Sequence, residues 1–227
     1  MPTEKTEQST SVELRVLPAE DVELRVDDSD GAARIVGYAA KYNRDSVDLG
    51  GFTEQIKPGA FDNALKSSDV RALKNHDANL LLGRTPKTLR LSSNSVGLRF
   101  EVDVPDTTVG RDTVEEIRRG DLTGCSFAFT VTEDTWRENE DGTYNRDINE
   151  VKELFDVGPV TYPAYPDTTV AARSLDKLKQ EKRTADGETA SGDETETKKP
   201  SPISIEEQSR LMWRLNTLKK KLPGPKG

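Results

Sequence analysis

Short stretches of alternating apolar and polar residues recur through the first two thirds of the chain, and they constrain its fold most strongly. In "VGLRFEVDV", residues 96–104, every second residue from Leu98 to Val104 is apolar. An extended backbone places these side chains on one face, so the stretch predicts a half-buried strand. Residues 33–43, 70–84, 125–132 and 151–166 predict further strands by the same pattern or by apolar runs of strand length.

The motif "VELRV" occurs twice near the start, at Val12–Val16 and Val22–Val26, separated by "LPAED". Alternation with a Pro-containing turn predicts either a hairpin or two sequential strands of the core sheet. Residues 1–11 are polar and without periodicity, so we expect a disordered N-terminus before the first strand.

Helices are fewer than strands in the predicted domain. "GRDTVEEIRRG" places Val114 and Ile117 on one face and ends at Gly120, a residue suited to a helix C-terminus. "PGAFDNALKS", residues 58–67, predicts a short helix with Phe61 and Leu65 four apart. The pattern therefore predicts a β-rich or α+β domain at residues 12–175.

The chain changes character after this domain. Residues 176–202 contain charged residues of both signs and a single large aliphatic residue, Leu178, so we expect a flexible linker. Residues 203–222 predict an amphipathic helix, since Ser204 and Glu207 have capping-box spacing and leucines repeat every three or four residues. Such a helix either docks on the domain or binds another chain, and residues 223–227 form a tail.

Composition excludes several classes of function. The formal net charge of −8 disfavours a nucleic-acid or anionic-membrane surface and leaves a protein partner as the better expectation. One cysteine cannot form an internal disulfide, and the chain lacks the residues of a structural zinc site. No glycine-rich phosphate loop is present, so we expect neither metal nor cofactor. The sequence shows no apolar leader and no run long enough to span a membrane, so we expect the protein to be made and used in the cytosol.

The chain contains one histidine, His76, so any Ser-His or Cys-His mechanism must use it. "LTGCSFAF", residues 122–129, offers Ser126 and Cys125 as nucleophiles. Strand alternation points them to opposite faces, so they cannot both attack one bond. Asp77, Glu153 and Asp156 are acidic candidates to orient the histidine. Each residue taken singly is equally well explained as a turn, core or solvated-face residue.

Several separated blocks, taken together, resemble a known family. Residues 120–129 read G-x-L-x-G-x-S-F-x-F, which is similar to the nucleophile motif of tailed-phage prohead proteases, serine peptidases distantly similar to herpesvirus assemblins. The blocks "GYAAKYN", "DLGGFTEQIKPGAF", "NHDANLLLGR" and "FDVGPVTYPAYPDT" resemble that family in the same order and extend from about Arg34 to Thr169.

The resemblance implies an α+β fold with a β-rich, barrel-like protease core and flanking helices. It implies Ser126 as nucleophile, His76 as general base and Asp156 as the residue that orients the histidine. Asp156 stands where the family commonly has Glu, and Gly158 where Ser is frequent. Cys125 falls at a variable position of the motif, which demotes it as a nucleophile. The oxyanion-binding groups are not readable from the sequence.

The resemblance also implies partners and a place of action. The expected substrate is the scaffolding segment of the phage major capsid protein, with the protease itself as a second candidate, inside the immature prohead in the host cytoplasm. Homo-oligomerisation stays open. The alternative is a noncatalytic capsid-assembly scaffold or binding module of the same fold, and a Cys125 hydrolase is a third hypothesis.

Overall fold

A computed structural model describes residues 4–17, 23–29, 32–161 and 175–180. The chain divides into two units, Met1–Gly187 and Glu188–Gly227, and the described residues all belong to the first. The predicted helix at 203–222, the tail and the linker from residue 181 onward lie outside the described residues. Among the described residues, no helix has the length and apolar character needed to cross a membrane.

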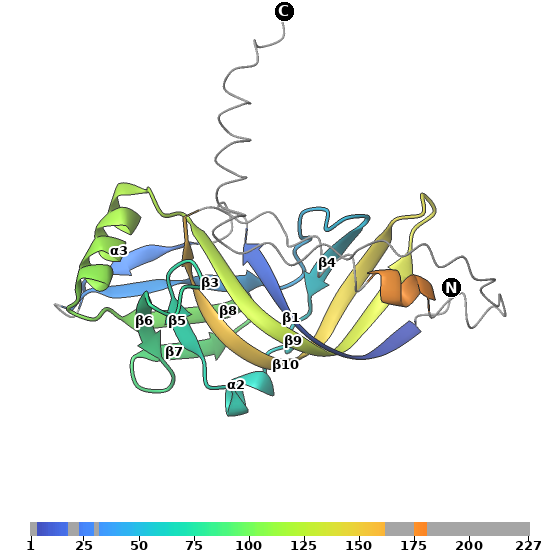
Figure 1. Ribbon diagram of the computed structural model, residues 1–227, viewed down its shortest axis with the longest axis horizontal. Coiled ribbons are helices and arrows are strands. Elements are labelled where there is room, and N and C mark those ends of the chain that lie inside the picture. The colour runs from blue at the N-terminus through green and yellow to red at the C-terminus, as the bar shows by residue number, and fades with distance from the viewer. Residues whose placement is uncertain (1–3, 18–22, 30–31, 162–174, 181–227) are drawn as a thin grey trace, which may run out of the picture. The chain divides into compact units, whose positions relative to one another are not determined.

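The larger sheet has six strands in the order β1-β9-β10-β5-β6, with β4 also pairing with β10 (Figure 1). Strands β1 and β9 flank one another antiparallel, as do β9 and β10, whereas β4 and β5 run parallel to β10. The strands are β1 (Glu4–Leu17), β4 (Phe52–Ile56), β5 (Arg71–Leu73), β6 (Leu81–Arg84), β9 (Gly124–Glu138) and β10 (Tyr144–Val160).

The smaller sheet has four antiparallel strands in the order β2-β3-β8-β7. They are β2 (Arg25–Asp27), β3 (Arg34–Lys41), β7 (Leu89–Ser93) and β8 (Gly97–Asp103). The described part of the chain is thus rich in strands and poor in helices, as the sequence predicts. Within it neither sheet closes on itself, so the barrel-like arrangement stays a prediction.

The two "VELRV" segments do not form the predicted hairpin or share a sheet. The first lies in β1 and pairs with β9, whereas the end of the second lies in β2 and pairs with β3. Identical short motifs specify alternation but not a pairing partner, which is why the sequence prediction was wrong here. Strand β1 also begins at Glu4, inside the segment that composition predicts to be disordered.

Helix α3 (Thr108–Arg119) follows β8 and agrees with the prediction. Thr107 caps its first turn by accepting a hydrogen bond from the Gly110 amide, and Gly120 ends it with a left-handed φ of 75°. Val114 and Ile117 are buried, as their spacing requires. The predicted helix at 58–67 is reduced to α2 (Ala64–Ser67).

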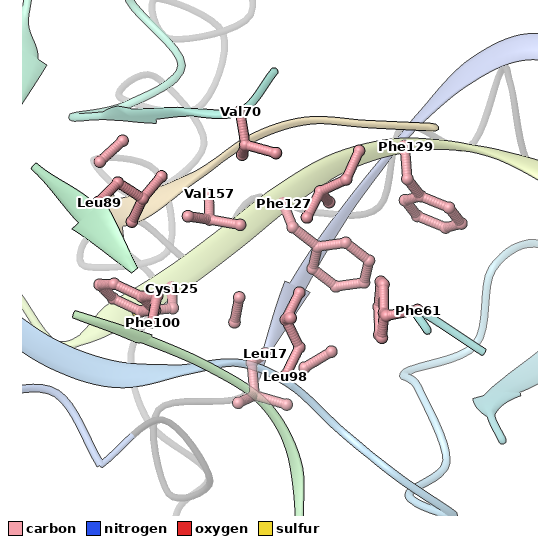
Figure 2. Packing of buried hydrophobic residues seen from close by; sticks show 14 of the residues in the cluster. Leu17, Phe61, Val70, Leu89, Leu98, Phe100, Cys125, Phe127, Phe129 and Val157 are labelled. Carbon is pink, nitrogen blue, oxygen red and sulfur yellow. The ribbon is translucent and has the colours of Figure 1, made fainter. Parts of the chain in front are cut away.

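The main apolar core includes the apolar side chains of β9 on one of its two faces. Cys125, Phe127 and Phe129 are buried there together with Phe61 and Phe100, as Figure 2 shows. Phe127 lies against Phe129 with ring centroids 4.9 Å apart. This packing fixes which side chains of β9 face the opposite way.

A second, smaller cluster extends the domain beyond its predicted limit. Residues 175–180 are helical, and Leu175 and Leu178 are buried against Phe52, Trp136 and Tyr144. The sequence prediction ended the domain at Leu175 and placed Leu178 in the linker. One leucine in a charged segment is a weak signal, but its partner one helical turn earlier makes a small apolar face.

Candidate active site

Ser126 lies near the start of β9, on the face opposite the aromatic core. Gly120 ends α3, the buried Leu122 anchors the following turn, and β9 begins at Gly124. Because side chains alternate along a strand, burial of Cys125 and Phe127 in the core turns Ser126 to the other face. Its residue is only 1% exposed, so its hydroxyl requires a polar partner.

His76 lies in the connection between β5 and β6, within the strand-like stretch 70–84. Its backbone has a φ of 57°, and that of Asn75 has a φ of 56°. Two successive left-handed residues reverse the chain within a few positions. The backbone amide of Asp77 donates to the Lys74 carbonyl and closes this turn. His76 is thereby presented at the end of β5 rather than on a strand.

Asp156 lies on β10, the strand between β9 and β5. It pairs with Ala128 of β9 and with Arg71 of β5, while Gly158 pairs with Ser126. Asp156 and Ser126 therefore lie on adjacent strands, and their positions along the strands are offset by two residues. The end of β5, with the turn that carries His76, approaches β10 from its other side.

The structure brings the three residues together. His76 Nε2 lies 2.5 Å from Ser126 Oγ, and His76 Nδ1 lies 2.5 Å from Asp156 Oδ1. An ionised carboxylate only accepts hydrogen bonds. The bond to Asp156 therefore requires a proton on His76 Nδ1, and His76 Nε2 can then accept a hydrogen bond from a hydroxyl. The side chains of His76 and Asp156 are 17% and 13% exposed. A shielded imidazole between a hydroxyl and a carboxylate can accept a proton from that hydroxyl.

The carbonyl oxygen of Arg15 is a further neighbour of the serine that the sequence pattern does not predict. Ser126 Oγ can donate to this oxygen, which lies 2.8 Å away on β1. Val16 pairs with Ser126 across the sheet, so the β1–β9 register sets this contact. A backbone carbonyl has no residue type of its own, and only knowledge of the strand pairing could have identified it.

Gly158 has a geometric role beside the site. A Cβ at this position would lie 1.9 Å from the Leu73 carbonyl oxygen, a separation that no side chain tolerates. Only glycine therefore allows β10 to approach the end of β5 so closely. With the strands this near, the short side chain of Asp156 reaches His76 without the extra methylene of Glu.

The other candidates lie elsewhere. Cys125 is fully buried in the apolar core, and this burial raises the pKa of its thiol far above the ordinary value. Asp77 accepts hydrogen bonds from the backbone and side chain of Asn79. Glu153 is exposed on β10. Among the described residues no cluster of three or more His, Cys, Asp or Glu side chains could hold a metal ion.

Comparison with family models gives a match that covers most of the domain. The model described as caudovirus prohead serine protease matches residues 20–181. The chain belongs to the caudovirus prohead serine protease family. The match includes β5, β9 and β10, and with them His76, Ser126 and Asp156. Family membership supports a protease that acts in capsid maturation.

Among solved structures, the bacteriophage T4 capsid assembly protease gp21 is similar with a TM-score of 0.43 and 13% identity, over 68% of this chain and 99% of that chain. A likeness at this level is too low to establish a common fold or activity. Comparison with curated protein sequences gives no significant match.

Proposed function

We propose that this family member is a serine endopeptidase that cleaves the scaffolding segment of the major capsid protein during prohead maturation. One observation carries the proposal: the chain's single histidine lies within hydrogen-bonding distance of both Ser126 and Asp156. These residues come from three separated segments, so their meeting is a product of the fold rather than of local sequence.

In this mechanism His76 Nε2 removes the Ser126 hydroxyl proton as Oγ attacks the scissile carbonyl. Collapse of the tetrahedral intermediate breaks the C–N bond, and His76 returns the proton to the leaving amine. Water then attacks the acyl-enzyme with His76 again as base, releasing the new carboxylate and free Ser126. Asp156 holds the proton on Nδ1 and stabilises the imidazolium that forms in each step.

The Arg15 carbonyl has a defined place in this cycle. Ser126 has one hydroxyl proton, which it donates either to His76 Nε2 or to the Arg15 oxygen. Attack requires the first of these arrangements. When His76 is protonated, its Nε2–H donates to Ser126 and the serine proton is directed to Arg15, so protonation of the histidine disables the nucleophile.

The competing hypothesis is a noncatalytic assembly module of the same fold. A serine-directed fluorophosphonate discriminates between the two, because covalent labelling of Ser126 requires an activated hydroxyl. We expect labelling of the native protein and none after denaturation. Absence of labelling in protein that is demonstrably folded favours the noncatalytic module.

The substrate is tested by mixing the full chain with its capsid subunit and mapping new termini by mass spectrometry. We expect Ser126→Ala to lower cleavage by at least about 10⁴-fold and Asp156→Asn by about 10⁴-fold, with folding preserved. Ser92→Ala is the matched control, because Ser92 is exposed on β7 of the other sheet. Undiminished cleavage by Ser126→Ala removes the proposal.

Several finer points belong to the same proposal. The protease acts inside the immature prohead in the host cytoplasm, and it also cleaves itself within the linker at 176–202.

The predicted helix at 203–222 recruits it to the shell, so deletion of residues 181–227 should lower incorporation into proheads. A distant relationship to herpesvirus assemblins and self-association are part of this proposal as well.

A further inference from the structure

The turn that carries His76 departs from ordinary strand or helix backbone geometry. His76 and Asn75 both have left-handed backbones, a conformation that residues other than glycine adopt at a cost. Asparagine is one of the few residues that tolerate it well. The turn connects two very short strands, β5 and β6, which supply few hydrogen bonds of their own.

Asn75 makes a set of contacts that tie this turn to β10 and the residue after it. Its backbone amide donates to the Pro159 carbonyl at 3.0 Å. Its side-chain Oδ1 accepts from the backbone amide of Thr161 at 2.8 Å. Its Nδ2 donates to Thr161 Oγ1 at 3.2 Å. The side-chain amide of Asn75 therefore makes two hydrogen bonds to Thr161, one as acceptor and one as donor.

The partners of Asn75 lie close in sequence to Asp156. Asp156 lies on the same strand, β10, a few residues before Pro159. Asn75 thus fixes the turn that carries the imidazole to the strand that carries the carboxylate. The two groups need to stay within hydrogen-bonding distance while a charge develops on the imidazole, and a displacement of about 1 Å can cost about 100-fold in rate.

We propose that Asn75 is a positioning residue for His76, which holds the imidazole against Asp156 and Ser126 through its bonds to Pro159 and Thr161. The inference rests on the proposed serine peptidase function. Asn75 touches neither the hydroxyl nor the carboxylate of the site in any described contact, so it acts through the backbone of its neighbour. This role accounts for a residue before the histidine that has a hydrogen-bonding side chain and tolerates a left-handed backbone.

Three substitutions separate the side-chain bonds from the backbone requirement. Asn75→Gly retains the left-handed conformation and removes both side-chain bonds. Asn75→Asp retains an acceptor for the Thr161 amide and is the conservative rescue. Thr161→Ala leaves Asn75 in place and removes only the acceptor of its Nδ2. Asn94→Gly is the control, because Asn94 likewise caps backbone amides, those of Val96 and Gly97, in the turn between β7 and β8.

The first measurement is the rate of fluorophosphonate acylation of the full chain, with saturation kinetics to separate binding from chemistry. We expect Asn75→Gly to lower the maximal rate by about 10–100-fold with reagent binding unchanged. Thr161→Ala should lower it by a smaller factor, Asn75→Asp should recover part of the loss, and Asn94→Gly should match the wild type. Thermal melts verify that each variant is folded at the assay temperature.

The second measurement is proton NMR of the imidazole, which is unambiguous because the chain has one histidine. The Nδ1 proton bound to Asp156 should give a downfield resonance in the wild type and in Asn75→Asp, and a broadened or absent one in Asn75→Gly. A role in stability alone would lower the melting temperature without affecting this resonance in the folded protein.

The outcomes keep the two proposals apart. If the wild type is acylated at Ser126 while Asn75→Gly and Thr161→Ala both react at its rate, the positioning role is wrong and the peptidase proposal stands. If the folded wild type does not react, the peptidase proposal fails first. If Asn75→Gly does not fold, Thr161→Ala decides alone, and a wild-type rate for it overturns the inference.

Discussion

At the scale of single residues, Cys125 and Ser126 illustrate how a strand assigns chemistry to neighbours. Cys125 lies on the core face of β9 and is fully buried, whereas Ser126 lies on the face that His76 and Asp156 reach. The thiol is the better intrinsic nucleophile of the two, but only as a thiolate. Burial among apolar side chains removes that form, so position decides against the more reactive group.

This predicts that Cys125 is chemically silent in the folded protein. Because burial raises its pKa and blocks access, a thiol reagent such as a disulfide-exchange dye should react only after denaturation. Cys125→Ala should retain wild-type cleavage and lose about 1 kcal/mol of unfolding free energy through a small cavity. Dye absorbance in native buffer and in denaturant measures the first expectation. Rapid native modification with loss of activity would instead favour a thiol nucleophile.

The sequence identified the three candidate site residues but not what holds them. The resemblance predicts His76, Ser126 and Asp156 because each lies in a block that is similar to the family, and strand alternation separates Ser126 from Cys125. Asn75 and the Arg15 carbonyl were not predicted as parts of the site. Their roles depend on strand register and on backbone groups, and neither leaves a pattern of residue types.

At the scale of elements, the close approach of β10 to β5 keeps the site together. The two strands pair in parallel at Asp156–Arg71 and Val157–Ala72. Gly158 follows directly and has no room for a Cβ, because the Leu73 carbonyl oxygen occupies that position. The backbone oxygen cannot move like a flexible side chain, so any side chain at residue 158 must separate the strands.

We therefore predict that Gly158→Ala disrupts both stability and activity. The added methyl group should lower the free energy of unfolding by about 1–3 kcal/mol or more and should move the His76 turn away from Asp156. Urea denaturation measures the first effect and acylation of Ser126 the second. Gly142→Ala serves as a control, because a Cβ at Gly142 would meet nothing within 4 Å and its strain, from a φ of 80°, is confined to a hairpin loop. Wild-type stability and rate in Gly158→Ala would contradict the predicted contact.

Element prediction succeeded where one pattern coincided with one element. The alternation at 96–104 became β8, the stretch at 33–43 became β3, and the pattern ending at Gly120 became α3. The pattern was less informative where the chain turns inside a strand-like stretch. Residues 70–84 form β5 and β6. The Asn and Asp residues of "KNHDAN" are typical of a turn, but they do not specify the two successive left-handed residues, Asn75 and His76, that this turn contains.

At the scale of the whole molecule, a buried ionic cluster joins four strands of the larger sheet. We define the cluster as Glu13 and Arg15 of β1, Glu54 of β4, Asp134 of β9 and Arg146 of β10. Arg146 donates to Glu13 at 2.7 Å, to Glu54 at 3.0 Å and to Asp134 at 2.7 Å. Arg15 donates to Glu54 at 2.7 Å through Nε.

Glu13 stays ionised in this cluster despite its burial. Burial by itself would raise the pKa of Glu13, but the charges of Arg146 and Arg15 outweigh it, and the pKa lies below its ordinary value. Attraction among the charges and a full set of hydrogen bonds offset the cost of removing them from water. The side chain of Arg15 is held here while its carbonyl faces Ser126, so the cluster fixes the part of β1 that borders the site.

The cluster should therefore be intolerant of losing a single member. Its three carboxylates and two guanidinium groups sum to −1, and Arg146→Met leaves −2 with Glu13, Glu54 and Asp134 short of donors. We expect a loss of about 3–5 kcal/mol in the free energy of unfolding, measured by urea denaturation. Arg111→Met is the control, because Arg111 pairs with Asp106 at the surface and should change stability by about 0.5 kcal/mol or less. Adding Glu13→Gln to Arg146→Met restores the sum to −1, so the double variant should lose less than the two single losses combined; losses that simply add would mean that Glu13 and Arg146 do not interact in the folded protein.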